Sequence, residues 1–251
     1  MIIIKTPEEV ARMRVSGRMA AEVRDTVAQS VAPGVTTGEL DDLARECMRK
    51  LGGKSAFFGY RGYPGQICVS VNEEVVHGIP GRRRIEIGDV VSLDVGVVFD
   101  GFIGDTATTV TVGVTDPEVV RLVSVGRKAL ELAVERAVSG ARLSDVSHTI
   151  ETVAVRAGFS VVREFVGHGI GRDMHEEPQI PNFGSPGRGP VLKPGMTLAF
   201  EPMINMGGAD VEVLDDGWTV VTRDRRPSVH FEHTVAIGEN GPEILTCLDP
   251  R

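Results

Sequence analysis

The chain reads Ile87-Gly88-Asp89-Val90-Val91-Ser92-Leu93-Asp94, and it repeats this pattern further on as Lys193-Pro194-Gly195-Met196-Thr197-Leu198-Ala199-Phe200-Glu201. Each stretch has a glycine, then an apolar run typical of a buried strand, then a carboxylate. The similarity indicates that two parts of the chain have the same local structure and that each part ends a strand in an acid.

Two further pairs of motifs occur in the same order around these stretches. His77-Gly78-Ile79 precedes the first stretch, and His168-Gly169-Ile170 precedes the second. Asp105-Thr106 follows the first, and Glu232-His233-Thr234 follows the second. We interpret the pattern as an internal duplication within one domain of residues 1–251, because the copies are too long and too few for a solenoid. Two copies that face each other would bring their matching carboxylates to one centre.

Helix and strand signals also occur twice in the same order. Thr6-Pro7-Glu8-Glu9 is typical of a capped helix start, and Thr36 with Glu39 resembles a capping box. We predict helices over residues 6–31, 36–52, 116–139 and 144–158, and strands over residues 67–71, 90–98, 161–165, 197–200, 218–221 and 229–237. This order predicts an α+β fold.

Composition excludes several classes of protein. With 41% hydrophobic and 25% charged residues, the chain has an ordinary globular composition. A net charge of −8 argues against a protein that grips nucleic acid. No apolar run approaches the roughly 20 residues that cross a bilayer, and the first residues do not resemble a signal peptide. Three cysteines without a CxxC pair are typical of a reducing compartment, so we expect a cytoplasmic protein.

Four acids stand at the duplicated positions. Asp94 and Glu201 interrupt apolar runs, and a buried carboxylate is unfavourable unless it is paired or bound to metal. A single such acid would more often form a salt bridge or cap a helix. Together, however, Asp94, Asp105, Glu201 and Glu232 carry four negative charges, which two divalent cations would neutralise beside one neutral imidazole. This oxygen-rich set favours Co, Mn, Fe or Zn, and it leaves the metal open.

A pair of cations would support hydrolysis. Two cations about 3.5–4 Å apart can share one water, lower its pKa from 15.7 toward ~7, and polarise a carbonyl. The shared hydroxide can then attack an amide without a covalent intermediate. The chain has no GxSxG motif, and nothing in the sequence marks Cys68 as a thiolate.

The motifs together resemble type I methionine aminopeptidases over nearly the whole chain. Those that carry the resemblance are Gly59-Tyr60-Arg61-Gly62-Tyr63-Pro64, Cys68-Val69-Ser70-Val71-Asn72, His77-Gly78-Ile79-Pro80, Asp94-Val95-Gly96, Gly104-Asp105-Thr106-Ala107, Gly167-His168-Gly169-Ile170-Gly171, His175-Glu176-Glu177-Pro178, Glu201-Pro202-Met203 and Phe231-Glu232-His233-Thr234. The resemblance implies the pita-bread fold, with two pseudo-symmetric halves around a curved antiparallel sheet. It also implies removal of the initiator methionine from nascent polypeptides with a small second residue.

The resemblance further implies a role for each site residue. Asp94 would bind one metal in bidentate fashion, Asp105 and Glu232 would bridge both metals, and His168 and Glu201 would bind the other. Glu201 would also carry a proton from the bridging water to the leaving amine. His77 and His175 would contact the substrate backbone and stabilise the tetrahedral intermediate; each could instead be an ordinary hydrogen-bonded turn residue.

The methionine pocket of the family corresponds here to Tyr60, Tyr63, Cys68, Trp218, Phe57 and Met174. Aromatic and sulfur groups suit a flexible thioether, although the tyrosines could be ordinary core residues. Met174 stands where an aromatic residue is common in the family. This difference leaves open the shape of the pocket and how bulky a second substrate residue the enzyme accepts.

The three remaining histidines are not expected to bind metal directly. We expect His148 to be an ordinary helix residue. His230 shares strand parity with Glu232 and should lie near the metals, whereas His233 should point the other way.

Two alternative functions stay open. A prolidase or proline aminopeptidase has a similar catalytic domain but normally carries an extra amino-terminal domain, for which a first helix at Thr6 leaves no room. A catalytically silent relative that binds RNA or protein would be expected to lack metal ligands. The short intervals from His168 to Glu201 and on to Glu232 do not fit the insertion of type II enzymes.

The expected partner is the nascent polypeptide. The mode of any ribosome association stays open, and we expect a monomer.

Overall fold

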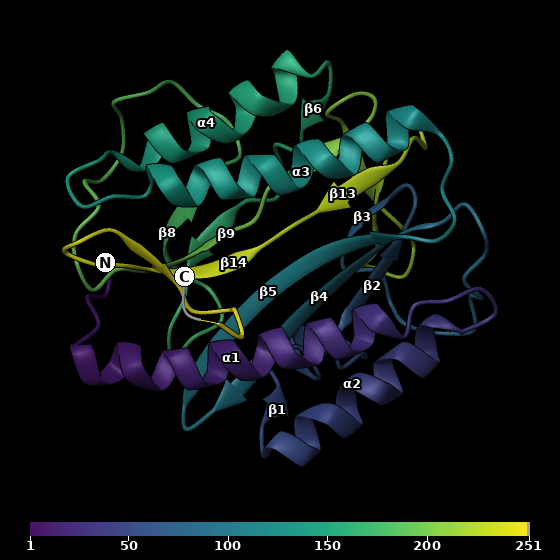
Figure 1. The fold of residues 1–251 in the computed structure, drawn as a ribbon, viewed down its shortest axis with the longest axis horizontal. Helices are drawn as coiled ribbons and strands as arrows, with labels where there is room; N and C mark the ends of the chain where they lie inside the picture. The colour runs from purple at the N-terminus through teal and green to yellow at the C-terminus, as the bar shows by residue number, and fades with distance from the viewer. Residues whose placement is uncertain (250–251) are drawn as a thin grey trace.

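Two pairs of helices enclose the strands in the computed structural model, which describes residues 1–249 (Figure 1). The helices are α1 (Pro7–Gln29), α2 (Thr37–Leu51), α3 (Pro117–Arg136) and α4 (Leu143–Arg156), with a 3-10 turn at Tyr60–Gly62. The strands of the first half are β1 (Lys54–Ser55), β2 (Cys68–Val71), β3 (Glu74–Val76), β4 (Val90–Phe99) and β5 (Phe102–Thr111). Those of the second half are β6 (Ser160–Val161), β7 (Gly167–Gly169), β8 (Glu176–Ile180), β9 (Thr197–Phe200), β10 (Met203–Asn205), β11 (Val211–Val213), β12 (Val220–Thr222), β13 (Ser228–His230), β14 (His233–Ile237) and β15 (Pro242–Ile244).

The four predicted helices are confirmed, and local capping explains their starts. The Thr6 hydroxyl accepts a hydrogen bond from Glu9 N, and the Glu9 carboxylate accepts one from Thr6 N. Thr36 and Glu39 make the same reciprocal pair at α2. These boxes satisfy amide groups that would otherwise lack partners. No helix within the described residues is both long enough and apolar enough to span a bilayer.

A long hairpin places the first pair of acids on one face of the sheet. Strands β4 and β5 pair antiparallel around a tight Asp100-Gly101 turn, in which both residues have positive φ as this hairpin class requires. Asp105 lies opposite Gly96, two residues from Asp94. Because side chains alternate between faces, Asp94 and Asp105 emerge on the same side.

The second half places its own residues by short strands. β9 pairs with β14 on one side and with β7 on the other, which sets His168 opposite Ala199 and leaves Glu201 just past the end of β9. The two halves meet through the backbone: Ala107 N donates to Glu232 O at 3.3 Å, and Glu232 N donates to Ala107 O at 3.0 Å. This exchange brings Glu232 to the hairpin that carries the first two acids.

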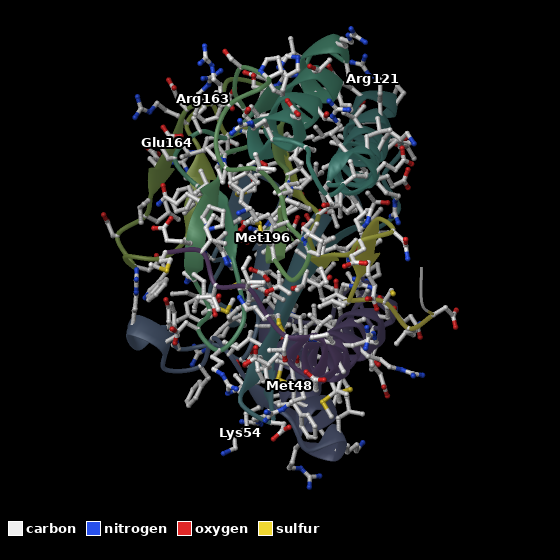
Figure 2. The ribbon with its side chains drawn as sticks, turned by 90° about the vertical axis from the view of Figure 1, so that its left-hand side faces the viewer. Met48, Lys54, Arg121, Arg163, Glu164 and Met196 are labelled. Atoms are coloured by element: carbon white, nitrogen blue, oxygen red, sulfur yellow. The ribbon has the colours of Figure 1, made fainter. Side chains whose placement is uncertain are left out.

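Three predicted strands differ from the structure by more than one residue. The strand predicted over 161–165 is β6 at Ser160–Val161, because the charged side chains of Arg163 and Glu164 extend outward at the surface (Figure 2). The strand predicted over 218–221 is β12 at Val220–Thr222, since the Asp216 carboxylate binds the amides of residues 218 and 219 in a turn.

The strand predicted over 229–237 is divided into β13 and β14. At the break, Phe231 N donates to Pro202 O at 3.3 Å and Glu232 bonds to Ala107 in the other half. These backbone bonds replace the regular ladder and leave the Glu232 side chain free to enter the site.

Each helix pair packs on its own apolar cluster. One cluster fills the space between α1, α2 and strands β2 and β4, and the other lies between α3, α4 and strands of the second half. Met196, only 3% exposed, belongs to the second cluster and lies near the middle of the molecule, whereas Lys54 and Arg121 lie toward opposite ends (Figure 2). The helices therefore form outer layers around the strands.

A glycine contact sets how closely α1 approaches β5. A methyl group added to Gly104, next to Asp105, would overlap Gly17 Cα and lie 2.5 Å from Gly17 N. Both partners are backbone, so neither can move aside cheaply.

We predict that Gly104→Ala lowers the free energy of unfolding by about 1–3 kcal/mol in chemical denaturation. Gly81→Ala is the control, because nothing lies within 4 Å of its added methyl; equal stability of both variants would contradict the close contact.

Candidate metal centre

One cavity of about 270 Å³ collects the predicted site residues. Its lining residues are Phe57, Tyr60, Arg61, Tyr63, Cys68, His77, Asp94, Asp105, Phe165, His168, Met174, His175, Glu201, Trp218 and Glu232. The structure thus brings together all the predicted metal ligands, both predicted substrate-contacting histidines and the whole predicted methionine pocket. Because acids and aromatic side chains both line it, the cavity combines charged groups with an apolar wall.

The predicted ligands come close around one imidazole. His168 Nε2 lies 3.9 Å from Asp105 Oδ2 and 3.6 Å from Glu201 Oε1. Ligand atoms of Asp105, His168 and Glu232 all lie within 4.8 Å of one another. Such spacing allows the three groups to hold a divalent cation.

Several buried acid oxygens have no partner among the described residues. Asp94 Oδ1, Asp105 Oδ1 and Glu232 Oε1 are shielded from solvent and accept no hydrogen bond from residues 1–249. Unsatisfied buried carboxylate atoms are costly, and in native structures they commonly mark an ion or water site. A set of carboxylate oxygens around a nitrogen donor is also what divalent transition metals bind. The residues present therefore fit the metal ions that their chemistry implies.

Burial and mutual repulsion disfavour ionisation of these acids in the protein without metal. Burial raises the pKa of Asp94 to about 7, against the lowering effect of its hydrogen bond with Asp105. Burial, and then the neighbouring acids, raise the pKa values of Asp105, Glu201 and Glu232 well above their ordinary range. Positive charge placed among them would reverse this effect.

His168 is oriented for ligation by its own backbone. Its Nδ1 lies 2.9 Å from Gly169 O, and a carbonyl can only accept, so Nδ1 carries the proton. The lone pair on Nε2 then faces the carboxylates, an arrangement common to metal-binding histidines. Burial, reinforced by His175, lowers the pKa of His168 to about 3, which keeps the ring neutral.

His77 and His175 line the cavity near the metal ligands. The ring of His175 lies 4.3 Å from the ring of His168, and its Nδ1 lies 2.9 Å from the Tyr60 hydroxyl. His77 has a left-handed backbone with φ of 61° and packs edge-on against Phe165 and Trp218. Burial lowers the pKa of His77 to about 4, and burial together with the Arg61 charge lowers the pKa of His175.

The apolar part of the cavity is firmly packed. The Tyr63 hydroxyl donates to Gly78 O at 2.9 Å, and its ring meets Trp218 edge to face with centroids 5.0 Å apart. Phe57, Cys68 and Met174 are buried beside them. Burial and the nearby Asp94 raise the pKa of the Cys68 thiol well above its ordinary value, so the thiol is not an activated nucleophile.

The other predicted histidines have the expected surroundings. His230 is buried, with Nε2 at 3.7 Å from Glu201 Oε2, so it lies beside the predicted ligands. His233 has Nδ1 at 2.9 Å from Thr246 Oγ1, and His148 on α4 has Nδ1 at 3.1 Å from Gly184 O.

Sequence reasoning missed two residues of the cavity wall. Arg61 is exposed at the cavity and has its guanidinium 5.4 Å from the centre of the Tyr60 ring, and Phe165 packs against His77. Arg61 lies inside the quoted Gly59–Pro64 motif, which could have pointed to it. Phe165 gave no such signal, because it stood at the end of a predicted strand that the structure shortens.

Comparisons with known proteins agree with this geometry. Residues 11–239 match the model of metallopeptidase family M24. The chain is 49% identical over 246 residues to methionine aminopeptidase 1 of Bacillus subtilis, covering 98% of this chain and 99% of that one. It superimposes on the methionine aminopeptidase of Thermotoga maritima with a TM-score of 0.97 and 50% identity, covering 98% and 99% of the two chains.

A more distant likeness concerns the fold alone. The prolidase of Pyrococcus furiosus superimposes with a TM-score of 0.81 at 24% identity, over 98% of this chain and 66% of that one. The predicted pita-bread fold and the resemblance to methionine aminopeptidases are confirmed. The chain therefore belongs to metallopeptidase family M24, in the group that contains the bacterial methionine aminopeptidases.

Proposed function

We propose that this cavity hydrolyses the peptide bond after an amino-terminal methionine, using divalent cations held by its carboxylates. The observation that carries the proposal is the group of buried, partnerless oxygens on Asp94, Asp105 and Glu232 around the His168 imidazole. Family membership supports metal-dependent peptide hydrolysis, and the similarity to methionine aminopeptidases supports methionine as the residue removed.

Five residues would hold a pair of cations. They are Asp94, Asp105, His168, Glu201 and Glu232. Their four carboxylates balance two divalent charges, and the mixture of oxygen and nitrogen donors suits Mn, Fe, Co or Zn. When bound, the cations lower the pKa of a shared water and polarise the carbonyl of the bond to be cut.

Glu201 is suited to move the proton. Its side chain is 13% exposed against 4% for Asp105, so it is the more accessible of the two from the cavity. We assign to its carboxylate the uptake of a proton from the attacking water and delivery of that proton to the leaving amine. This transfer needs one group within reach of both sites.

The two cavity histidines are suited to hold the substrate backbone. Their lowered pKa values keep both rings uncharged at neutral pH. Nδ1 of His175 lies 2.9 Å from the Tyr60 hydroxyl. We assign the tautomer in which this hydroxyl donates to Nδ1, so that the Nε2–H of His175 is left to donate to a substrate oxygen. Such a donor stabilises negative charge that develops on the carbonyl oxygen.

The apolar wall is suited to bind the methionine side chain. Its members are Phe57, Tyr60, Tyr63, Cys68, Met174 and Trp218. Their rings and sulfur atoms give dispersion and sulfur–aromatic contacts to a thioether. The proposed substrate is the initiator methionine of nascent polypeptides whose second residue is small. We further propose that the protein acts as a monomer in the cytoplasm, where it meets nascent chains at the ribosome.

Metal dependence and substrate choice are tested together. We predict that protein stripped by a chelator hydrolyses Met-Ala-Ser only after a divalent metal is restored, because the carboxylates alone activate no water. Release of methionine is measured by chromatography, with Met-Pro and Xaa-Pro peptides in parallel. Preference for Xaa-Pro would favour a prolidase, and inactivity with every metal would favour a silent binding protein.

The role of Glu201 predicts a distinct kinetic effect. Glu201→Gln keeps the shape of the side chain but removes its ability to accept a proton. We predict that turnover slows by about two orders of magnitude or more, the size of general acid–base contributions, while KM changes less. Steady-state kinetics on Met-Ala-Ser check this; an equal loss in binding and turnover would assign Glu201 to substrate binding instead.

The raised acid pKa values predict how stability depends on pH without metal. The buried histidines of the site have lowered pKa values, so above pH 7 they are neutral in the folded protein and largely neutral in the unfolded chain, and they contribute little. The buried acids hold protons in the folded state that the unfolded chain has already lost, so the free energy of unfolding falls as pH rises. We predict that the free energy of unfolding in chelator falls between pH 7 and 8.5, measured by urea unfolding. Saturating Mn²⁺ should abolish the slope; a stability that rises with pH in chelator would contradict it.

A further inference from the structure

A short loop, Gly171–Glu176, carries two side chains of the cavity wall. Met174 is buried in the apolar part, and His175 faces His168. The position of this loop matters for the reaction, because the proposed function needs His175 beside the substrate backbone. The loop follows β7 and ends at the first residue of β8, so the strands fix its ends but not its interior.

A buried ion pair fastens the end of this loop to the amino-terminal segment. Lys5 Nζ donates to the Glu176 carboxylate, and the two side chains are only 3% and 4% exposed. The other carboxylate oxygen, Oε1, accepts from Arg172 N at 3.1 Å, which closes the loop on itself. Lys5 is held in turn through its backbone, because Lys5 N donates to Gly195 O at 2.8 Å.

The space for this pair depends on a glycine. A methyl group on Gly171 would lie 2.5 Å from Glu176 Oε1 and 2.6 Å from Lys5 Cε. The pair is therefore tightly enclosed between the loop and the amino-terminal segment. Lys5 and Glu176 are separated by 171 positions in sequence, so the contact is purely tertiary.

A second contact fastens the start of the loop to the same segment. Arg172 donates to the Glu9 carboxylate at 3.3 Å, and its guanidinium lies 4.3 Å from the centre of the Phe102 ring. Arg12, one helical turn on from Glu9, lies 4.9 Å from the same ring and bonds to Asp100. Lys5 and Glu9 thus hold the loop at its two ends.

The energetics indicate that the buried pair serves positioning more than stability. Exposed ion pairs such as that of Arg172 contribute little. A buried pair must offset the desolvation of both charges, and apolar replacement is often neutral or stabilising. Because the charged lysine is enclosed, the loop has one favoured position relative to the amino-terminal segment. Any displacement of the loop would leave a buried charge without its partner.

We propose that Lys5 and Glu176 are positioning residues for methionine removal, acting through His175. The ion pair holds the 171–176 loop so that His175 donates to the substrate and Met174 closes the methionine pocket. The inference rests on the proposed function, since it assumes that His175 contacts the substrate.

The test compares Lys5→Met with a matched variant on the same segment. Lys5→Met keeps the apolar stem and removes the charge, and we expect kcat/KM for Met-Ala-Ser to fall on the order of 10-fold or more, because small displacements of substrate-contacting groups reduce the rate strongly. Arg14→Met is the control: it breaks the exposed pair between α1 and Glu243, and it should leave kcat/KM unchanged. Glu176→Gln keeps an acceptor for Arg172 N and serves in place of Lys5→Met if that protein does not fold.

A double-mutant cycle separates positioning from general destabilisation. If Lys5 acts through His175, Lys5→Met should cause little further loss of kcat/KM in a His175→Ala background, whereas independent effects would multiply. Multiplying losses, or a Lys5→Met protein as active as the wild type, would overturn the inference. A wild-type protein inactive on methionyl peptides would instead overturn the proposed function.

Discussion

Four carboxylates buried around one imidazole form the constraint on which the rest of the structure depends. No arrangement of like charges this close is favourable in a low-dielectric interior without positive charge among them. In the protein without metal, bound protons neutralise these carboxylates, as the raised pKa values of Asp94 and its neighbours indicate. Metal ions would do so in the active protein. The fold therefore maintains an acidic cluster that must be neutralised either by protons or by metal cations.

The strands that hold the acids also hold the substrate pocket. Cys68 on β2 lies opposite Asp94 on β4, so a pocket residue and a proposed ligand share one face and one register. Glu232 reaches the same point from the other half because its backbone pairs with Ala107. The Cys68 side of the methionine pocket and the carboxylates at the reacting bond are thus fixed relative to one another by sheet geometry.

Sequence reasoning worked where the determining interactions are local. The helices were predictable because Thr6 and Thr36 cap their own helices, and the acids were recognisable because they interrupt apolar runs at repeated positions. It failed where distant segments decide the structure. The break at Glu232 depends on Ala107 in the other half, and the enclosure of Lys5 depends on Glu176, which is 171 positions away in sequence. The three-residue strands such as β7 are too short to show any periodicity.

Diffraction from crystals grown with Mn²⁺, recorded at the manganese absorption edge, tests the metal centre most directly. We expect two anomalous peaks in the cavity, both in bonding contact with the carboxylates of Asp105 and Glu232, with His168 bound to one of them. Peaks at other places, or carboxylates that remain bonded only to each other and to water at saturating metal, would show that these residues do not hold the metal ions.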